Sequence, residues 1–252
     1  MRVSREVVRE LVSNGAEAVM LVGSHVRGDT YGESDVDICA IGRGRSYSLR
    51  RVDGFLVSIS WSMAKSWRRK LKEPSEAGGA VAALRSAIIL HDPRGVAAAL
   101  KHEATEWTWD VLGRRRETWV AEEFTGWAEE VHRLIGNLEL GRGWAAAIQR
   151  SVLALRLAPV LAVHYRILYD TENLLWDLVG GKMGTRWTRA QNAALSMGGE
   201  SFEESCTAAL ELFLLAAEEL HSLLDDRQRK VVEHACAIAE RAIGTKRVAR
   251  GA

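Results

Sequence analysis

The sequence predicts an α+β protein, with an N-terminal α/β domain built on a small mixed sheet and a C-terminal all-α helical bundle. Short apolar runs that end in glycine or alternate with polar residues, as strands do, occur only in about the first hundred residues. Beyond them, apolar residues recur at helical spacing. We therefore expect a first domain over residues 1–104 and a helical bundle over residues 105–252.

Elements of the first domain alternate between helix and strand. The opening segment has apolar residues at helical spacing, and Asn14-Gly15 is a typical helix stop. The next apolar run ends at Gly23-Ser24, which indicates a strand followed by a tight turn. The expected elements are, in order, helix 4–14, strands 18–22, 36–41 and 55–61, helices 63–72 and 80–90, and a turn at 91–95.

Helical spacing dominates the rest of the chain. A long Ala/Leu-rich helix is expected at residues 144–169, with a kink at Pro159 because proline lacks the N–H that an interior helical bond needs. Further helices at residues 119–138, 202–224 and 226–243 complete a bundle of about four or five.

Composition narrows the class of partner. Lys and Arg number 34 against 33 Asp and Glu, whereas proteins that live on nucleic acid usually carry a basic excess. No long uncharged apolar run is present, and the first residues do not form a signal peptide. Three widely spaced cysteines suit buried thiols in a reducing compartment. We expect a cytoplasmic protein with neither a nucleic-acid nor a membrane partner.

One stretch, residues 22–38, carries groups that suit phosphate chemistry. Gly23 lets backbone amides approach a ligand closely, and Ser24 adds a hydroxyl donor. Asp35 and Asp37 are separated by one residue on an expected strand, so both carboxylates face the same side. Two such acids repel each other unless a cation such as Mg²⁺ compensates them. The alternative interpretation is a turn followed by a strand with two solvated aspartates.

This segment resembles the Gly-Ser plus Asp-x-Asp motif of the DNA polymerase β-like nucleotidyltransferase superfamily. The whole chain looks most like the kanamycin nucleotidyltransferase branch, to which residues 91–95 and 163–171 are also similar. The resemblance implies transfer of a nucleoside monophosphate, AMP from ATP or another NTP, to a hydroxyl of a small-molecule acceptor. It further implies Mg²⁺ or Mn²⁺ as cofactor, an aminoglycoside-like acceptor with a role in antibiotic resistance, and a homodimer.

Carried over by position, the resemblance makes Asp35 and Asp37 the metal ligands and catalytic carboxylates. Ser58 holds the place where the family has a third carboxylate, which is a departure, and Asp53 lies too far along to replace it. A hydroxyl is a poor ligand for magnesium, so the number of metal ions stays open. The residues expected to bind the nucleotide are Gly23, Ser24, Arg27, Ser34 and Arg133.

Related enzymes take a general base from the first long helix of the helical domain. Glu129 is the first choice here because Arg133 follows it by four residues, and Glu123 is the second. The resemblance implies that the partner chain of a dimer contributes Glu129 to the cleft. Glu122 and Glu130 lie on the same helix, and a solvated acidic face is the competing interpretation of all four residues.

Two other functions stay open from the sequence. The first is a nucleotide-binding or regulatory protein of the same fold whose catalysis is weakened, which Ser58 motivates. The second is an antitoxin-like transferase that modifies a protein partner, although proteins of that group are usually shorter.

Overall fold

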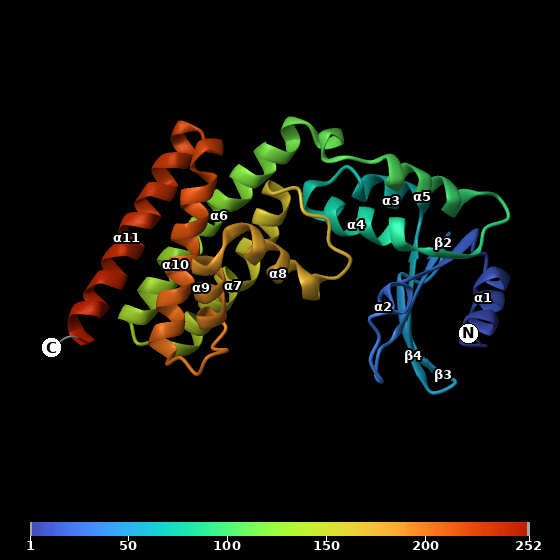
Figure 1. Cartoon of the computed structure of the whole chain (residues 1–252), viewed down its shortest axis with the longest axis horizontal. Coiled ribbons are helices and arrows are strands. Elements are labelled where there is room, and N and C mark those ends of the chain that lie inside the picture. The colour runs from blue at the N-terminus through green and yellow to red at the C-terminus, as the bar shows by residue number, and fades with distance from the viewer. Residues whose placement is uncertain (1, 251–252) are drawn as a thin grey trace. The chain divides into compact units, whose positions relative to one another are not determined.

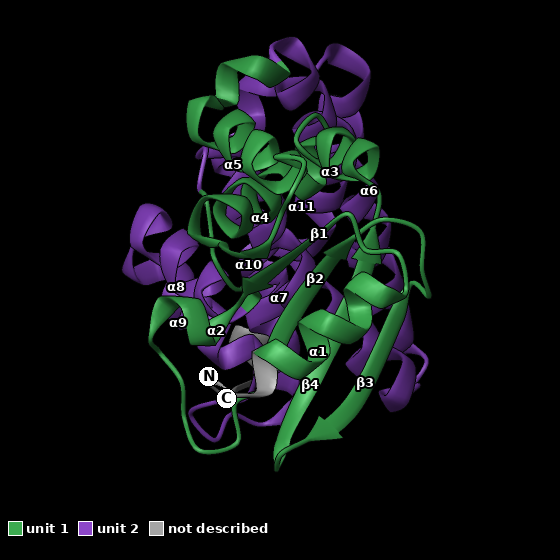
Figure 2. Ribbon diagram, turned by 90° about the vertical axis from the view of Figure 1, so that its right-hand side faces the viewer, with its two compact units in different colours: residues 1–112, 168–172 green, residues 113–167, 173–252 purple. Residues whose placement is uncertain are grey.

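The structure is a computed structural model that describes the backbone of residues 2–250 and the side chains of residues 5–244. The chain forms two compact units (Figure 2). The first comprises residues 1–112 with 168–172, and the second comprises residues 113–167 with 173–252. The limit expected at residue 104 falls inside a helix, Val96–Glu106. The segment 168–172 joins the first unit from far along the sequence.

A mixed five-stranded sheet forms the centre of the first unit (Figure 1). Its strand order is β3-β4-β2-β1-β5, in which β2 and β4 run parallel and all other neighbours run antiparallel. The strands are β1 (Ala18–Val22), β2 (Val36–Ile41), β3 (Tyr47–Val52), β4 (Phe55–Ser62) and β5 (Ile88–His91). The predicted α+β class with a small mixed sheet is confirmed.

Helix α1 (Arg2–Ser13) covers one face of this sheet, so the strand residues packed against it identify that face. Val7 and Leu11 of α1 belong to one core cluster with Val36 and Ile38 of β2. Because strand side chains alternate between faces, Asp37 lies on the face opposite α1. The unit also contains α2 (Ser24–Arg27), α3 (Ala64–Lys70), α4 (Pro74–Ser86), α5 (Val96–Glu106) and the 3₁₀ turn η1 (Trp109–Leu112).

Two strands of the sheet differ from the sequence prediction. The expected helix over residues 80–90 is wrong at its end, because α4 stops at Ser86 and residues 88–91 form β5 against β1. Pro74 at the first position of α4 shows where this helix begins, since proline there loses no helical hydrogen bond. The second difference is β3, which was not predicted and forms a hairpin with β4 through Asp53-Gly54.

The second unit is all helical over its described residues. Its helices are α6 (Arg114–Glu139), α7 (Gly143–His164), α8 (Glu172–Met183), α9 (Thr185–Ala194), α10 (Phe202–Leu220), the turn η2 (His221–Leu223) and α11 (Asp226–Arg250). In the described part of the chain, α7 is the one helix long and apolar enough to cross a membrane. Half of that apolar stretch is buried, and α7 packs against α6 and α10, as the core helix of a bundle does.

Candidate active site

The turn after β1 brings the backbone of Gly23 against the carboxylate of Asp37. Gly23 has φ 78° and ψ −159°, a conformation that is essentially restricted to glycine. A Cβ at this position would overlap the side chain of Asp37. The sequence needs glycine here for two separate reasons, the backbone conformation and the close approach of a carboxylate.

Asp37 lies between two neighbouring strands on the face of the sheet opposite α1. It is directly opposite Val22 of β1 and directly opposite Ser58 of β4. The Ser58 hydroxyl donates a hydrogen bond to Oδ1 of Asp37 at 2.6 Å. Ser58 therefore occupies the neighbouring-strand position that the sequence assigned to it, and it orients Asp37.

Burial is the main influence on the charge of Asp37 and raises the pKa of its carboxyl above the ordinary value. The hydrogen bond from Ser58 lowers this pKa, the nearby charge of Asp35 raises it, and Arg27 and His25 lower it. Asp35 itself is half-buried immediately before β2. The site thus holds two neighbouring carboxylates, with the positive charge of Arg27 close enough to act on Asp37.

Arg27 is held in place by two acceptors within the first unit. Its Nε donates to Asp29 Oδ2 at 3.0 Å, and its Nη1 donates to the backbone carbonyl oxygen of Asp170 at 3.3 Å. The side chain of Arg27 is only 18% exposed. The segment 168–172 therefore reaches the Gly-Ser turn, a contact that no local sequence pattern indicated.

His25 follows Ser24 in the turn, and its imidazole ring is partly enclosed by the protein. Its ring lies edge-on to Phe55 with centroids 6.4 Å apart, and its Nε2 is buried without a hydrogen-bond partner.

Ser34 has a local structural role, because its hydroxyl oxygen accepts a hydrogen bond from the backbone N–H of Tyr31 at 2.9 Å. The Ser34 hydroxyl thus fixes the loop that leads to Asp35.

The donor set fits a hard divalent cation. Carboxylate oxygens are the ligands that Mg²⁺ and Mn²⁺ prefer, and the neighbouring negative charges of Asp35 and Asp37 would favour such an ion. No group of three or more His, Cys, Asp or Glu side chains arranged for metal binding occurs among the described residues. An ion bound here would therefore complete its shell with phosphate oxygens and water, which also suits the Gly-Ser turn beside it.

The expected base residues lie in the second unit, on α6. Arg133 donates to Glu129 at 2.6 Å and to Glu130 at 2.8 Å, so its guanidinium is engaged by both carboxylates. Glu129 is exposed, whereas Glu130 is buried and keeps one oxygen without a partner. Glu123 is half-buried on the same helix. The assignment of a base and of Arg133 as a phosphate contact stays a prediction.

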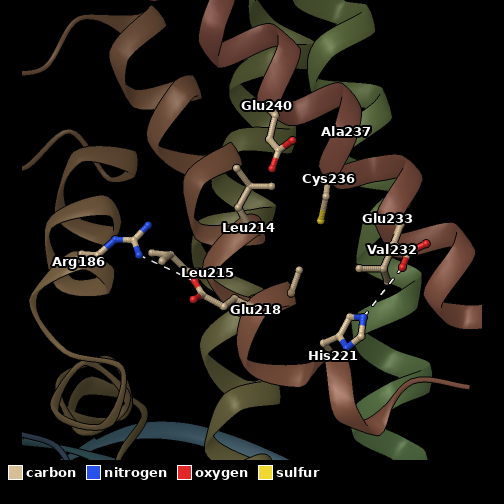
Figure 3. Close-up of a pocket in the computed structure, with 11 residues that line it drawn as sticks. Arg186, Leu214, Leu215, Glu218, His221, Val232, Glu233, Cys236, Ala237 and Glu240 are labelled. Carbon is tan, nitrogen blue, oxygen red and sulfur yellow. Dashed lines mark ion pairs between the residues drawn. The ribbon is translucent and has the colours of Figure 1, made fainter.

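Two of the cavities in the described part of the chain each lie within one unit, and neither is lined by Asp35 or Asp37. One of about 370 Å³ lies between α3, α4 and the segment 168–172, with Trp67, Lys70 and Tyr169 in its wall. The other, of about 710 Å³, lies between α9, α10 and α11 of the second unit (Figure 3). Its wall combines Leu214 and Val232 with acidic side chains, and Cys236 points into it (Figure 3).

For the nucleotidyl transfer that the resemblance implies, Ser58→Ala should lower the rate about tenfold and shift the acidic limb of the pH–rate profile upward. The Ser58 hydrogen bond lowers the pKa of Asp37, so its loss raises that pKa, and the ionised carboxylate is then available only at higher pH. Ser60→Ala is the matched control, because Ser60 lies on the same strand face but opposite Cys39. An unshifted acidic limb in Ser58→Ala would contradict this role.

Cys236 should react slowly with iodoacetamide at neutral pH. Burial, followed by the charges of Glu240 and Glu233, raises the pKa of its thiol from 9.0 to about 11, and the thiolate is the reactive form. The alkylation rate of Cys236 should rise about tenfold per pH unit up to pH 10 without levelling off. Cys236→Ser gives the background rate, and Glu240→Gln should make the curve level off earlier. A plateau near pH 9 in the unaltered protein would show that this thiol is not shifted.

Comparisons with known proteins bear on the fold and on the family of the N-terminal part of the chain. Residues 1–124 match the nucleotidyltransferase domain family. A nucleotidyltransferase-like protein from Exiguobacterium sibiricum 255-15 has a similar structure, with a TM-score of 0.54 at 14% identity over 88% of this chain and 74% of that chain. At that identity the likeness shows the fold alone. No curated protein was found to match.

Proposed function

We propose that this chain, a nucleotidyltransferase whose residues 1–124 match the nucleotidyltransferase domain family, moves a nucleoside monophosphate, AMP from ATP, to a hydroxyl of a small molecule. The observation that supports this most is the position of the Asp37 carboxylate. It lies against the Gly23 backbone and is held by Ser58, with the charge of Asp35 beside it. A polyphosphate at the turn and a cation at the aspartates would then be neighbours.

The chain's own groups would act mainly by position and charge, which is what phosphoryl transfer requires. Gly23 lets the turn approach the triphosphate, and Ser24 offers a hydroxyl at the start of α2. Arg27 is already oriented by Asp29 and Asp170, so its guanidinium needs little reordering to bind phosphate. Asp35 and Asp37 would hold Mg²⁺ or Mn²⁺, which when bound neutralises charge that develops on the phosphate oxygens.

A carboxylate must also accept the proton of the attacking hydroxyl. We propose Glu129 for this role and Glu123 as the second choice. Glu129 is exposed and bonded to Arg133, so it is accessible to a second copy of the chain, as the proposed homodimer requires. The acceptor is proposed only as a hydroxylated small molecule. The resemblance makes an aminoglycoside-like molecule one member of that class, and it adds a role in antibiotic resistance and a cytoplasmic location to the proposal.

The direct test is release of pyrophosphate from each of the four common NTPs with Mg²⁺ or Mn²⁺ across a panel of hydroxylated acceptors. We expect release that depends on the metal, on the acceptor and on Asp35. Mass spectrometry of the acceptor should show a gain of one nucleoside monophosphate.

A binding or regulatory function is the second candidate, and the neutral Ser58 beside Asp37 favours it. It predicts that ATP binds with metal but that no acceptor yields pyrophosphate. Calorimetry with a non-hydrolysable ATP analogue, run beside the release assay, separates the two functions. Loss of both binding and release would refute both.

A further inference from the structure

The open edge of the sheet carries an unusual row of exposed apolar side chains. Tyr47, Leu49 and Leu56 are 54%, 51% and 45% exposed, and Arg51 is exposed among them. These four residues, three from β3 and one from β4, are called the open strip below. Their apolar side chains are neighbours on one face of β3 and β4, and contiguous exposed apolar patches of this kind can serve as binding surfaces.

The open strip lies on the same face as Asp37. Leu49 is directly opposite Ser58, and Ser58 is directly opposite Asp37, so the three side chains form one row across the sheet. Arg50, the next residue after Leu49, bonds Glu10 of α1 on the other face, which independently fixes the orientation of Leu49. Two strand spacings separate Leu49 from Asp37, or about 10 Å.

The in-line geometry of transfer indicates from which side of Asp37 the acceptor approaches. The attacking oxygen and the leaving pyrophosphate lie roughly in line on opposite sides of the α-phosphorus. If the triphosphate tail is held by the turn at Gly23 after β1, the tail lies to the β1 side of Asp37. The acceptor must come from the opposite side, which is the β4 and β3 side where the open strip lies.

Charge near the open strip indicates what kind of acceptor it would take. Arg43, Arg45 and Arg51 are exposed on or just before β3. Between residues 43 and 62 the one carboxylate is Asp53, which lies at the far turn of the hairpin. This surface would repel a polycation and attract an anion. Its apolar members, with an exposed tyrosine ring, suit a flat apolar body.

We propose that the open strip is the acceptor subsite and that it selects a hydroxylated aromatic or otherwise apolar molecule with a negative charge. The inference rests on the proposed function and narrows its substrate class. The acceptor hydroxyl oxygen forms a bond to the α-phosphorus while the bond from that phosphorus to the pyrophosphate oxygen breaks. The hydroxyl proton passes to a carboxylate base and then to solvent, and pyrophosphate leaves with the bonding electron pair.

The test uses two acceptors of equal size and opposite charge, 4-hydroxyphenylacetate and tyramine, with kanamycin as a polycation. Transfer from ATP labelled at the α-phosphate is measured for each of the three acceptors. We expect the anion to be used at least tenfold faster than tyramine. Arg51→Glu should lower that ratio at least tenfold, and Leu49→Ser should slow both aromatic acceptors together.

Arg9→Glu is the control, since it makes the same charge change at an exposed position of α1, on the other face of the sheet. It should leave the ratio unchanged. Faster transfer to tyramine or kanamycin, an unchanged ratio in Arg51→Glu, or no transfer to the anion while another acceptor is used would overturn the inference. Failure to bind the ATP analogue, or binding without transfer to any acceptor, would overturn the proposed function and the inference with it.

Discussion

Asp35→Asn should lower nucleotidyl transfer by at least about 10²–10³-fold while the protein stays folded. The substitution removes one negative charge and almost no volume at a half-buried position beside Asp37. The removed charge is one of the two that would hold a cation against the phosphates. That interaction strengthens as charge develops in the transition state. Transfer from α-labelled ATP measures the rate, and circular dichroism reports the fold.

The melting temperature gives this prediction a second readout. Because the charge of Asp35 raises the pKa of Asp37, the two carboxylates repel each other in the metal-free protein. Asp35→Asn removes this repulsion, so without metal its Tm should equal or exceed that of the unaltered protein. Mg²⁺ with ATP should raise the Tm of the unaltered protein more than that of the variant.

Glu33→Gln is the matched control, since it removes an exposed carboxylate two residues earlier in the same loop. It should leave both rate and Tm close to those of the unaltered protein. Undiminished transfer by folded Asp35→Asn, or an equal loss in Glu33→Gln, would place the chemistry elsewhere.

The motif strands were predictable because their local signals are strong. Strands β1 and β2 begin and end where the sequence predicts, since β1 is a short apolar run that ends at Gly23 and β2 is apolar apart from Asp37 and ends at Gly42. β4 extends one residue beyond its expected end at Trp61. Ser58 also lies directly opposite Asp37, on the neighbouring strand where the resemblance places it. The resemblance to a known family supplied the roles, and spacing supplied the geometry.

The missed elements lack such signals or depend on distant residues. In β3 two arginines interrupt the apolar alternation, although Asp53-Gly54, with φ of 49° and 88°, is the typical turn of a two-residue hairpin and was the available clue. β5 has only four residues and follows a helix without a glycine or proline break. The contact of Arg27 with the Asp170 carbonyl joins positions 143 residues apart, which no local pattern can reveal.

The second large effect is expected from Gly23→Ala, which should reduce ATP affinity at least about 100-fold and abolish measurable transfer. Two costs combine at this position. An alanine resists a φ of 78° with a ψ of −159°, which costs about 1–3 kcal/mol. Its Cβ would also overlap the Asp37 carboxylate, so the turn or the strand has to move. Either movement separates the polyphosphate turn from the aspartates.

Gly28→Ala separates strain from overlap. Gly28 ends α2 with φ 82° and ψ 16°, in the left-handed region, and a Cβ there meets no atom within 4 Å. This control should cost about 1 kcal/mol of folding stability and leave ATP affinity within about threefold. Calorimetry with a non-hydrolysable ATP analogue and Mg²⁺ measures both variants. Equal losses of affinity in the two variants would mean that backbone strain in the loop is enough to explain the loss. A folded Gly23→Ala protein that binds the analogue normally would show that the nucleotide does not use this turn. The close approach of Gly23 to Asp37 therefore makes the single methyl group of alanine a direct probe of the proposed site.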